Sequence, residues 1–239
     1  MQNIVIFGAS GHGSVVLDCL EREGKYNVVG FVDSFKKEGR KQNGYEILGR
    51  EYDLPFLMER HNLYGGIIAV GDNWTRNLLV KKILSIAPSF NFISAVHPSA
   101  VIGKNVDIGM GTAVMPGAII NANSIVGDFC IINTNSSLGH DGTMENYSSI
   151  ASGVCTGGGF TLGEFSAISV GARIIENITI MDHTLVGAGA LVVKDIESHV
   201  VAYGSPARII RKRSVGEHYL SGNKSEQTRT EFPLIPNNF

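Results

Sequence analysis

The sequence predicts two units of different fold class, a small N-terminal α/β domain and a parallel β-helix, and three observations carry this prediction. Residues 1–92 alternate short apolar runs with amphipathic stretches. From residue 96 to residue 192 the residue at every sixth position is almost always apolar. Many of the 29 glycines fall between these apolar positions. We therefore divide the chain into an α/β domain at 1–92, a β-helix at 93–197 and a C-terminal extension at 198–239.

The N-terminal part shows the alternation of strands and helices that is typical of a short parallel sheet built from βαβ units. Its first strand runs into the sequence GASGHG at 8–13, which opens an amphipathic stretch. Right-handed crossovers are expected between the strands. Asn73 is the expected N-cap of the last helix. The expected strands are 3–7, 28–32 and 67–70, and the expected helices are 14–20 and 75–86.

The six-residue period predicts the β-helix. It fits neither a helix nor an alternating strand, but it fits a short strand followed by a turn, three times per coil. Thr156 is the single polar residue among the seventeen anchor positions. The anchors are Val96, Ile102, Ile108, Val114, Ile120, Val126, Ile132, Leu138, Met144, Ile150, Thr156, Leu162, Ile168, Ile174, Ile180, Val186 and Val192.

Composition excludes several classes of partner. The formal net charge of −2 gives no basis for binding nucleic acid or an anionic membrane surface. The chain has no apolar stretch of the length that a membrane span needs, and its N-terminus lacks the pattern of a signal peptide, so we expect a cytoplasmic protein. Its three cysteines lack metal-ligand spacing, and we expect no metal.

Two motifs resemble a known family. The sequence GSPAR at 204–208 resembles the G-x-P-A-[KR] close of hexapeptide-repeat sugar acyltransferases. The glycine loop at 8–13 resembles the subgroup with an N-terminal nucleotide-sugar-binding domain. That subgroup contains bacillosamine-type and perosamine-type N-acetyltransferases and relatives that O-acetylate sialic acid. The resemblance implies left-handed coils, a homotrimer, active sites between adjacent prisms, and acetyl-CoA as co-substrate.

His140 and Asp141 are the candidate catalytic residues. His140 lies two residues after the anchor Leu138, where its side chain should face outward. Family members carry a His-Glu or His-Asp pair here, and the resemblance implies that the histidine is a general base. The chemistry agrees, because acyl transfer to an amine releases a proton and free imidazole has a pKa of about 6.5. The neighbouring carboxylate would orient the ring and stabilise its protonated form.

The resemblance also implies the binding residues. Acetyl-CoA contacts carry over to Val170 and Ala188, and a family histidine at this site maps onto Ser149. The contacts to the nucleotide-linked sugar carry over to positions in the glycine loop and at two strand ends. In a uridine-nucleotide member an acidic residue stands where Ser34 stands here, so the base remains open. These positions are Ser10, Gly11, His12, Asp33, Ser34 and Gly71.

These residues favour an acetyl-CoA-dependent N-acetyltransferase that acts on a nucleotide-linked amino sugar, such as a 4-amino-4,6-dideoxyhexose. The amine would attack the thioester directly, without an acyl-enzyme. O-acetylation of a sugar is the rival enzyme function. A β-helix scaffold without catalysis is a third alternative, which the intact pair of His140 and Asp141 disfavours.

Overall fold

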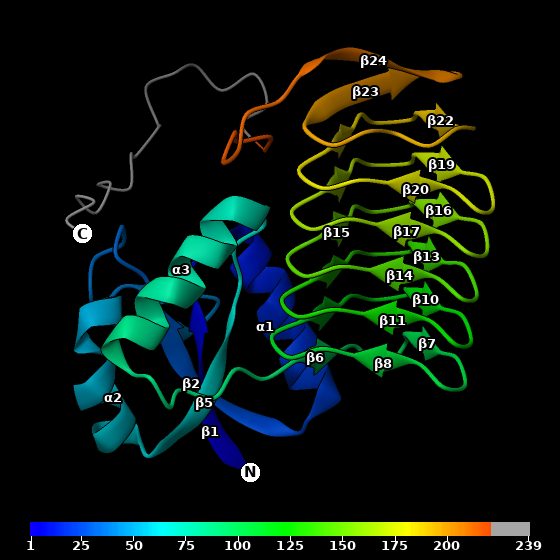
Figure 1. Cartoon of the computed structure of the whole chain (residues 1–239). Helices are drawn as coiled ribbons and strands as arrows, with labels where there is room; N and C mark the ends of the chain where they lie inside the picture. The colour runs from blue at the N-terminus through cyan, green and yellow to red at the C-terminus, as the bar shows by residue number, and fades with distance from the viewer. Residues whose placement is uncertain (221–239) are drawn as a thin grey trace.

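The computed structural model describes residues 1–220, which form an α/β domain packed against a left-handed parallel β-helix (Figure 1). The predicted fold class is confirmed. The sheet of the first domain has five strands in the order β3-β4-β2-β1-β5, and β1 pairs in parallel with both β2 and β5. The strands are β1 (Gln2–Phe7), β2 (Tyr26–Val32), β3 (Lys41–Gln42), β4 (Tyr45–Gly49) and β5 (Leu63–Ile68), and the helices are α1 (Gly11–Glu23), η1 (Glu51–Asp53), α2 (Leu54–His61) and α3 (Asn73–Ile86).

Helices cover both faces of this sheet. The buried face of α1, which includes Val16 and Leu20, packs with Ile4 and Ile6 of β1. The buried face of α3 packs with the side chains that β1 directs the other way, among them Phe7. This arrangement follows from the period of two in β1, because successive side chains point to opposite faces of a sheet.

The predicted N-cap of α3 is wrong by one residue. Asp72 caps the helix, because its Oδ1 accepts a hydrogen bond from the Thr75 backbone N–H at 2.9 Å. Asn73 is instead the first helical residue and donates from Nδ2 to the Ser166 carbonyl of the β-helix. Asp and Asn are comparable N-caps in isolation, so the contact with the second domain decides between them.

Seventeen short strands wind the β-helix, and each pairs in parallel with the strand one coil away, 18 residues along the chain. The strands form three sheets, which are the faces of a triangular prism (Figure 1). The strands are β6 (Ala95–Val96), β7 (Val101–Ile102), β8 (Asp107–Ile108), β9 (Ala113–Val114), β10 (Ile119–Ile120), β11 (Ile125–Val126), β12 (Ile131–Ile132), β13 (Ser137–Leu138), β14 (Thr143–Met144), β15 (Ser149–Ile150), β16 (Cys155–Thr156), β17 (Thr161–Leu162), β18 (Ala167–Ile168), β19 (Arg173–Ile174), β20 (Thr179–Ile180), β21 (Leu185–Val186) and β22 (Leu191–Val192).

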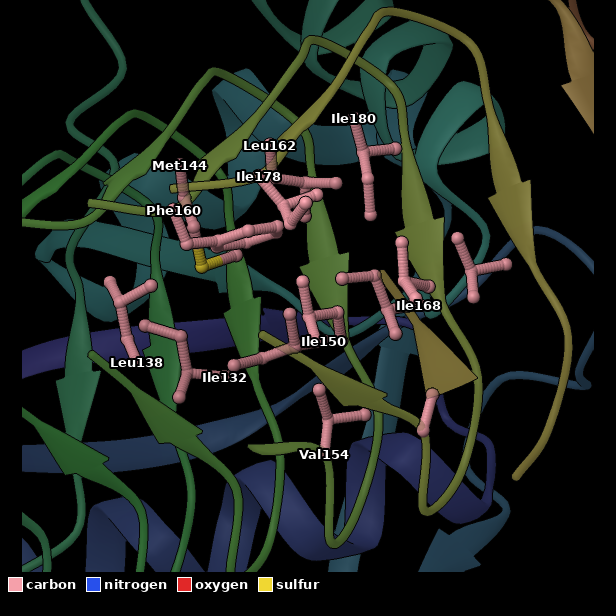
Figure 2. Close-up of a cluster of buried hydrophobic side chains, with 14 of the residues drawn as sticks. Ile132, Leu138, Met144, Ile150, Val154, Phe160, Leu162, Ile168, Ile178 and Ile180 are labelled. Carbon is pink, nitrogen blue, oxygen red and sulfur yellow. The ribbon is translucent and has the colours of Figure 1, made fainter. Parts of the chain in front are cut away.

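The anchor is the second residue of each of these strands, and the stacked anchors make the core of the prism (Figure 2). From Val114 to Val192 every anchor is buried. Three anchors of the first coil, Val96, Ile102 and Ile108, are partly or largely exposed. They lie at the open end of the prism, where no coil stacks beneath them.

The structure continues past the periodic region. β23 (Val200–Gly204) pairs in parallel with β21 and so extends one face of the prism. β24 (Ala207–Lys212) pairs with β23 as an antiparallel hairpin. The chain then folds back toward α3 (Figure 1). Of the predicted extension at 198–239, residues 221–239 lie outside the described residues. Within residues 1–220, no helix has the length and apolar character that crossing a bilayer requires.

Candidate active site

The glycine loop joins β1 to α1. Ser10 is the N-cap of α1, and its hydroxyl accepts a hydrogen bond from the Gly13 N–H at 3.4 Å. Gly8 has a φ of +102°, and a side chain at Gly13 would collide with the Gly8 carbonyl. A Cβ at Gly11, in contrast, would meet no atom of the described chain within 4 Å. Gly8 and Gly13 therefore build the loop, whereas Gly11 leaves space beside the helix N-terminus.

The carboxylate of Asp33 stabilises this loop through hydrogen bonds with backbone N–H groups. Its Oδ2 accepts from the Ala9 N–H and its Oδ1 from the Phe35 N–H, both at 2.8 Å. Ser34 takes part in a separate cluster, because its hydroxyl donates to Glu51, which pairs with Lys82 at 2.8 Å. The structure therefore gives the carboxylate of Asp33 a role in shaping the loop, and it joins Ser34 to the η1 region.

His12 and Gly71 belong to a buried junction around Arg76. The guanidinium of Arg76 is buried and donates to the carbonyls of Gly71 and Phe129, at 3.0 and 2.8 Å. It thereby ties the β5–α3 connection to the β-helix. Burial, with the nearby charge of Arg76, lowers the pKa of His12 to about 4, so its imidazole is neutral at pH 7. His12 Nε2 is buried and has no hydrogen-bond partner among residues 1–220.

A cavity of about 360 Å³ lies between the two domains, and it brings together five of the predicted binding residues. That volume lies within the range that is typical of small-molecule sites, roughly 300–1,000 Å³. Its walls are largely aliphatic, which suits the apolar portions of an acyl donor. The predicted residues in its lining are His12, Gly71, Ser149, Val170 and Ala188, and the other lining residues are Ile131, Asn133, Ile150, Ala151, Ile168, Ser169, Tyr219 and Leu220. Ser10, Gly11, Asp33 and Ser34 are not part of the lining.

His140 and Asp141 lie on the turn from β13 to β14. The imidazole Nδ1 lies 2.6 Å from Asp141 Oδ2, and the histidine side chain is 70% exposed. A carboxylate accepts hydrogen bonds, so Nδ1–H is the donor, and in the neutral form of the ring Nε2 carries the lone pair. The hydrogen bond from His140, with a second one from Asn123, lowers the pKa of Asp141 and keeps it ionised. An outward-facing basic nitrogen beside a fixed carboxylate can accept a proton from a bound nucleophile.

Thr156, the polar exception among the anchors, lies on β16, which pairs with β13 in the next coil toward the C-terminus. Its side chain is in the core, and its hydroxyl accepts a hydrogen bond from the Gly139 N–H at 3.0 Å. At the equivalent place in the coil above, the Gly157 N–H donates to the carbonyl of Ile174, as in a regular ladder. The sequence marks position 156 as an exception to the period, but no role was predicted for it. The departure from the period was the signal, because a buried hydroxyl needs a partner.

His140 and the cavity lie on opposite sides of the prism. The cavity is lined by strands of one face, β12, β15 and β18, and by the turns that follow them. The turn that carries His140 joins the other two faces of the prism. It therefore lies on the edge opposite the face that lines the cavity. Figure 1 shows the turns from β13 to β14 on the side away from α1 and α3. One chain therefore does not bring the predicted base to the predicted binding residues.

No cluster of three or more metal-ligating side chains occurs in the part of the chain that the structure describes. The three cysteines are free thiols, and Cys19 and Cys130 are buried. Burial raises the pKa of the Cys19 thiol to about 12 and that of Cys130 to about 11. Both thiols are therefore protonated at neutral pH and do not offer a thiolate nucleophile.

Comparison with known proteins identifies the N-terminal domain first. Residues 3–83 match the model of the PglD N-terminal domain. A curated relative, UDP-N-acetylbacillosamine N-acetyltransferase of Bacillus subtilis (strain 168), is 34% identical over 121 residues. The match spans 47% of this chain and about half the length of that relative, 50%.

Solved structures match nearly the whole chain. PerB from Caulobacter crescentus, in complex with CoA and GDP-perosamine, is 36% identical with a TM-score of 0.82, and the match covers 88% of this chain and 98% of that one. The chain belongs to the bacillosamine/perosamine-type hexapeptide-repeat acetyltransferase family. The acetyltransferase domain of PglB from Neisseria gonorrhoeae FA1090, in complex with acetyl coenzyme A, is 29% identical with a TM-score of 0.81, over 87% and 99% of the two chains.

Proposed function

We propose that this protein transfers the acetyl group of acetyl-CoA to the amine of a nucleotide-linked amino sugar. The observation that carries the proposal is the pair of His140 and Asp141 on an exposed β-helix turn, in a chain that superimposes on a relative bound to CoA and GDP-perosamine. Acetyl-CoA is the co-substrate, and a 4-amino-4,6-dideoxyhexose is the sugar class we expect. A cytoplasmic location remains a prediction from the sequence.

The reaction needs one proton transfer, and we assign it to His140. The sugar amine attacks the thioester carbonyl, and its nitrogen becomes cationic as the C–N bond forms. Nε2 of His140 takes the proton from this nitrogen, while Asp141, hydrogen-bonded at Nδ1, stabilises the imidazolium. The C–S bond then breaks, the amide forms, and CoA leaves as a thiolate that the imidazolium protonates. This sequence needs no acyl-enzyme and no metal.

The positions of His140 and the cavity support a site shared between chains. Because they lie on opposite sides of one prism, the base of one chain must serve the cavity of another. A triangular prism with three-fold symmetry repeats this contact around a closed ring, which makes a homotrimer the simplest assembly. Acetyl-CoA would then lie in the cavity of one chain, and the nucleotide sugar between the glycine loop of that chain and His140 of its neighbour.

The activity is tested by incubating the protein with acetyl-CoA and a panel of UDP-, dTDP- and GDP-linked amino sugars. We expect release of CoA and an N-acetylated product with at least one of them. The corresponding sugars with a hydroxyl in place of the amine are the matched controls. Acetylation of the hydroxyl sugars alone would replace this proposal with O-acetylation.

The shared site is tested by mixing two inactive variants. His140→Ala removes the base, and Gly11→Val fills the space beside the helix N-terminus without meeting protein atoms. Each variant alone should be nearly inactive, whereas trimers assembled from both should regain part of the wild-type rate, because some sites combine an intact base with an intact loop. Mixed trimers with no more activity than either parent would contradict the shared site.

A further inference from the structure

The segment at 213–220 is built into the fold beside the cavity. Arg213 is buried and donates from Nη1 to the His183 carbonyl and from Nη2 to the Glu217 carbonyl, at 2.9 and 2.8 Å. Glu217 pairs with Arg211 of β24 at 2.6 Å. Gly216, with a φ of +76°, lies against the indole of Trp74 on α3. The segment is therefore fixed at both the β-helix and the α/β domain.

Tyr219 connects the two sets of predicted ligand contacts. Its hydroxyl lies 3.2 Å from the Gly71 carbonyl on the β5–α3 connection and 3.1 Å from Asn73 Oδ1 at the start of α3. The same hydroxyl lies 3.2 Å from the Ser149 hydroxyl on β15. Its ring also lies 5.5 Å from the guanidinium of Arg213. Such a set of contacts holds the phenol in one orientation at the edge of the cavity.

The segment lines the cavity without filling it. Tyr219 and Leu220 both belong to its lining, and a volume of about 360 Å³ remains beside them. Leu220 lies over Gly71, where a Cβ would come within 2.9 Å of its Cδ1. The segment therefore adds one polar group and one apolar group to the walls of the cavity.

We propose that residues 213–220 form a fixed wall of the acyl-donor site and that the Tyr219 hydroxyl is a binding group for the CoA moiety there. This rests on the proposed function, which places acetyl-CoA in the cavity. The hydroxyl can donate one hydrogen bond and accept others, so a carbonyl or amide N–H of bound CoA would take the place of one of its present partners, the Gly71 carbonyl, Asn73 Oδ1 or the Ser149 hydroxyl. The affinity for acetyl-CoA therefore depends on a segment that lies outside both the glycine loop and the six-residue repeat.

Tyr219→Phe tests the hydroxyl while keeping the ring. We expect the Kd for CoA, measured by calorimetry on the full chain, to rise about twofold to twelvefold, the change that corresponds to a net hydrogen bond of about 0.5–1.5 kcal/mol. The KM for the nucleotide sugar and kcat should change little. Tyr45→Phe is the control, because that hydroxyl bonds Glu21 on the outside of the α/β domain and lies away from the cavity. An unchanged Kd in Tyr219→Phe would overturn the proposal.

Gly216→Val tests the wall from outside the cavity. A side chain at this left-handed position would come within 2.8 Å of Trp74 Nε1, so the segment should detach while every other cavity residue stays intact. Trp74 is the single tryptophan, and its emission should shift to longer wavelength in this variant, with a weaker Kd for CoA. A shifted emission with an unchanged Kd would contradict the wall.

CoA binding to the wild-type protein distinguishes a segment that stays docked beside the ligand from one that occupies the site and leaves when the ligand binds. Saturating CoA should leave the Trp74 emission in place, because the segment stays docked. A shift to longer wavelength on CoA binding would overturn the proposal and show that the segment leaves the site. Failure of the proposed function is distinguishable, because a protein that acetylates none of the sugars can still bind CoA with an affinity that depends on Tyr219.

Discussion

Two edges of the β-helix share one backbone conformation but carry different side chains. At both edges the non-glycine residues with positive φ stand at the same point of their turns, separated by 18 residues or a multiple of 18 except between His183 and His199. On the edge that carries His140 they are polar: Asn105, Asn123, Asp141 and Asn177. On the edge between the next two faces they are ring-bearing: Phe129, Tyr147, Phe165, His183 and His199. The six-residue period fixes the turn, and the residue placed on it decides what the edge contacts.

The ring-bearing edge is an internal interface. Its rings stack at centroid distances of 4.8–5.3 Å, and Trp74 of α3 packs against Phe165. Left-handed φ is unfavourable for aromatic residues, so the stacking and the docking of α3 must offset that cost. Asparagine adopts the same φ readily and needs no partner. The polar edge therefore stays open and presents His140, while the ring-bearing edge holds the α/β domain.

The largest expected effect comes from His140→Ala on the open edge. Loss of a general base lowers kcat by about 10²- to 10⁴-fold, while the fold should be unaffected because the side chain is exposed. The measurement is kcat together with the Kd for CoA, which should stay near the wild-type value. Recovery of the full kcat at high pH, where the free amine is abundant, would leave His140 a positioning role only.

Substitution on the two edges should affect stability unequally. Phe165→Ala removes stacking with Tyr147 and His183 and the contact with Trp74, and should lower the free energy of unfolding by about 2–3 kcal/mol. Asn105→Ala on the open edge is the matched control and should cost less than about 1 kcal/mol. Urea unfolding measures both. Equal losses would mean that the ring-bearing edge does not hold the α/β domain.

The imidazole Nε2 of His12 is buried, unlike the exposed side chain of His140, and His12 should make the stability of the fold depend on pH. The folded pKa of His12 is about 4, and its unperturbed value is 6.5. Its neutral form favours folding above pH 6.5, and that stability is lost as pH falls toward 4, because the unfolded chain binds a proton that the folded chain does not. Between pH 7 and pH 5 the wild type should lose about 1–2 kcal/mol more unfolding free energy than His12→Gln. Identical losses would place His12 in a more hydrated environment.

The smallest effect should come from Thr156→Val, in the coil that follows the turn carrying His140. Valine keeps the shape but removes the acceptor for the Gly139 N–H, so the turn that carries His140 should lose its fixed position. We expect kcat to fall about tenfold, equivalent to about 1.4 kcal/mol, with KM values little changed. Thr156→Ser restores the hydroxyl and should recover most of the rate. If Thr156→Ser were as slow as Thr156→Val, the hydroxyl would not be the cause.

Local rules explain which parts of the structure could be predicted from the sequence. The anchors predicted the coil interior because a side chain at each sixth position must face the same way, and Ile132 and Leu138 are fully buried as expected. The helix N-cap was misplaced because Asn73 bonds Ser166, 93 residues away. The hydrogen-bond partners of the Tyr219 hydroxyl lie 70 or more residues away, and no periodicity marks its segment.

The sequence by itself determined the period, the core of the prism, the glycine loop and the adjacent pair of His140 and Asp141, because each depends on neighbours along the chain or on a repeat. Only the tertiary structure decided how these parts meet. It placed the cavity on the side of the prism opposite His140. It packed the α/β domain against the ring-bearing edge, where Arg76 bonds the Phe129 carbonyl, and it brought the Tyr219 hydroxyl to Ser149. The physical reason is that cavities and buried polar junctions arise from contacts between distant segments, which local spacing does not specify.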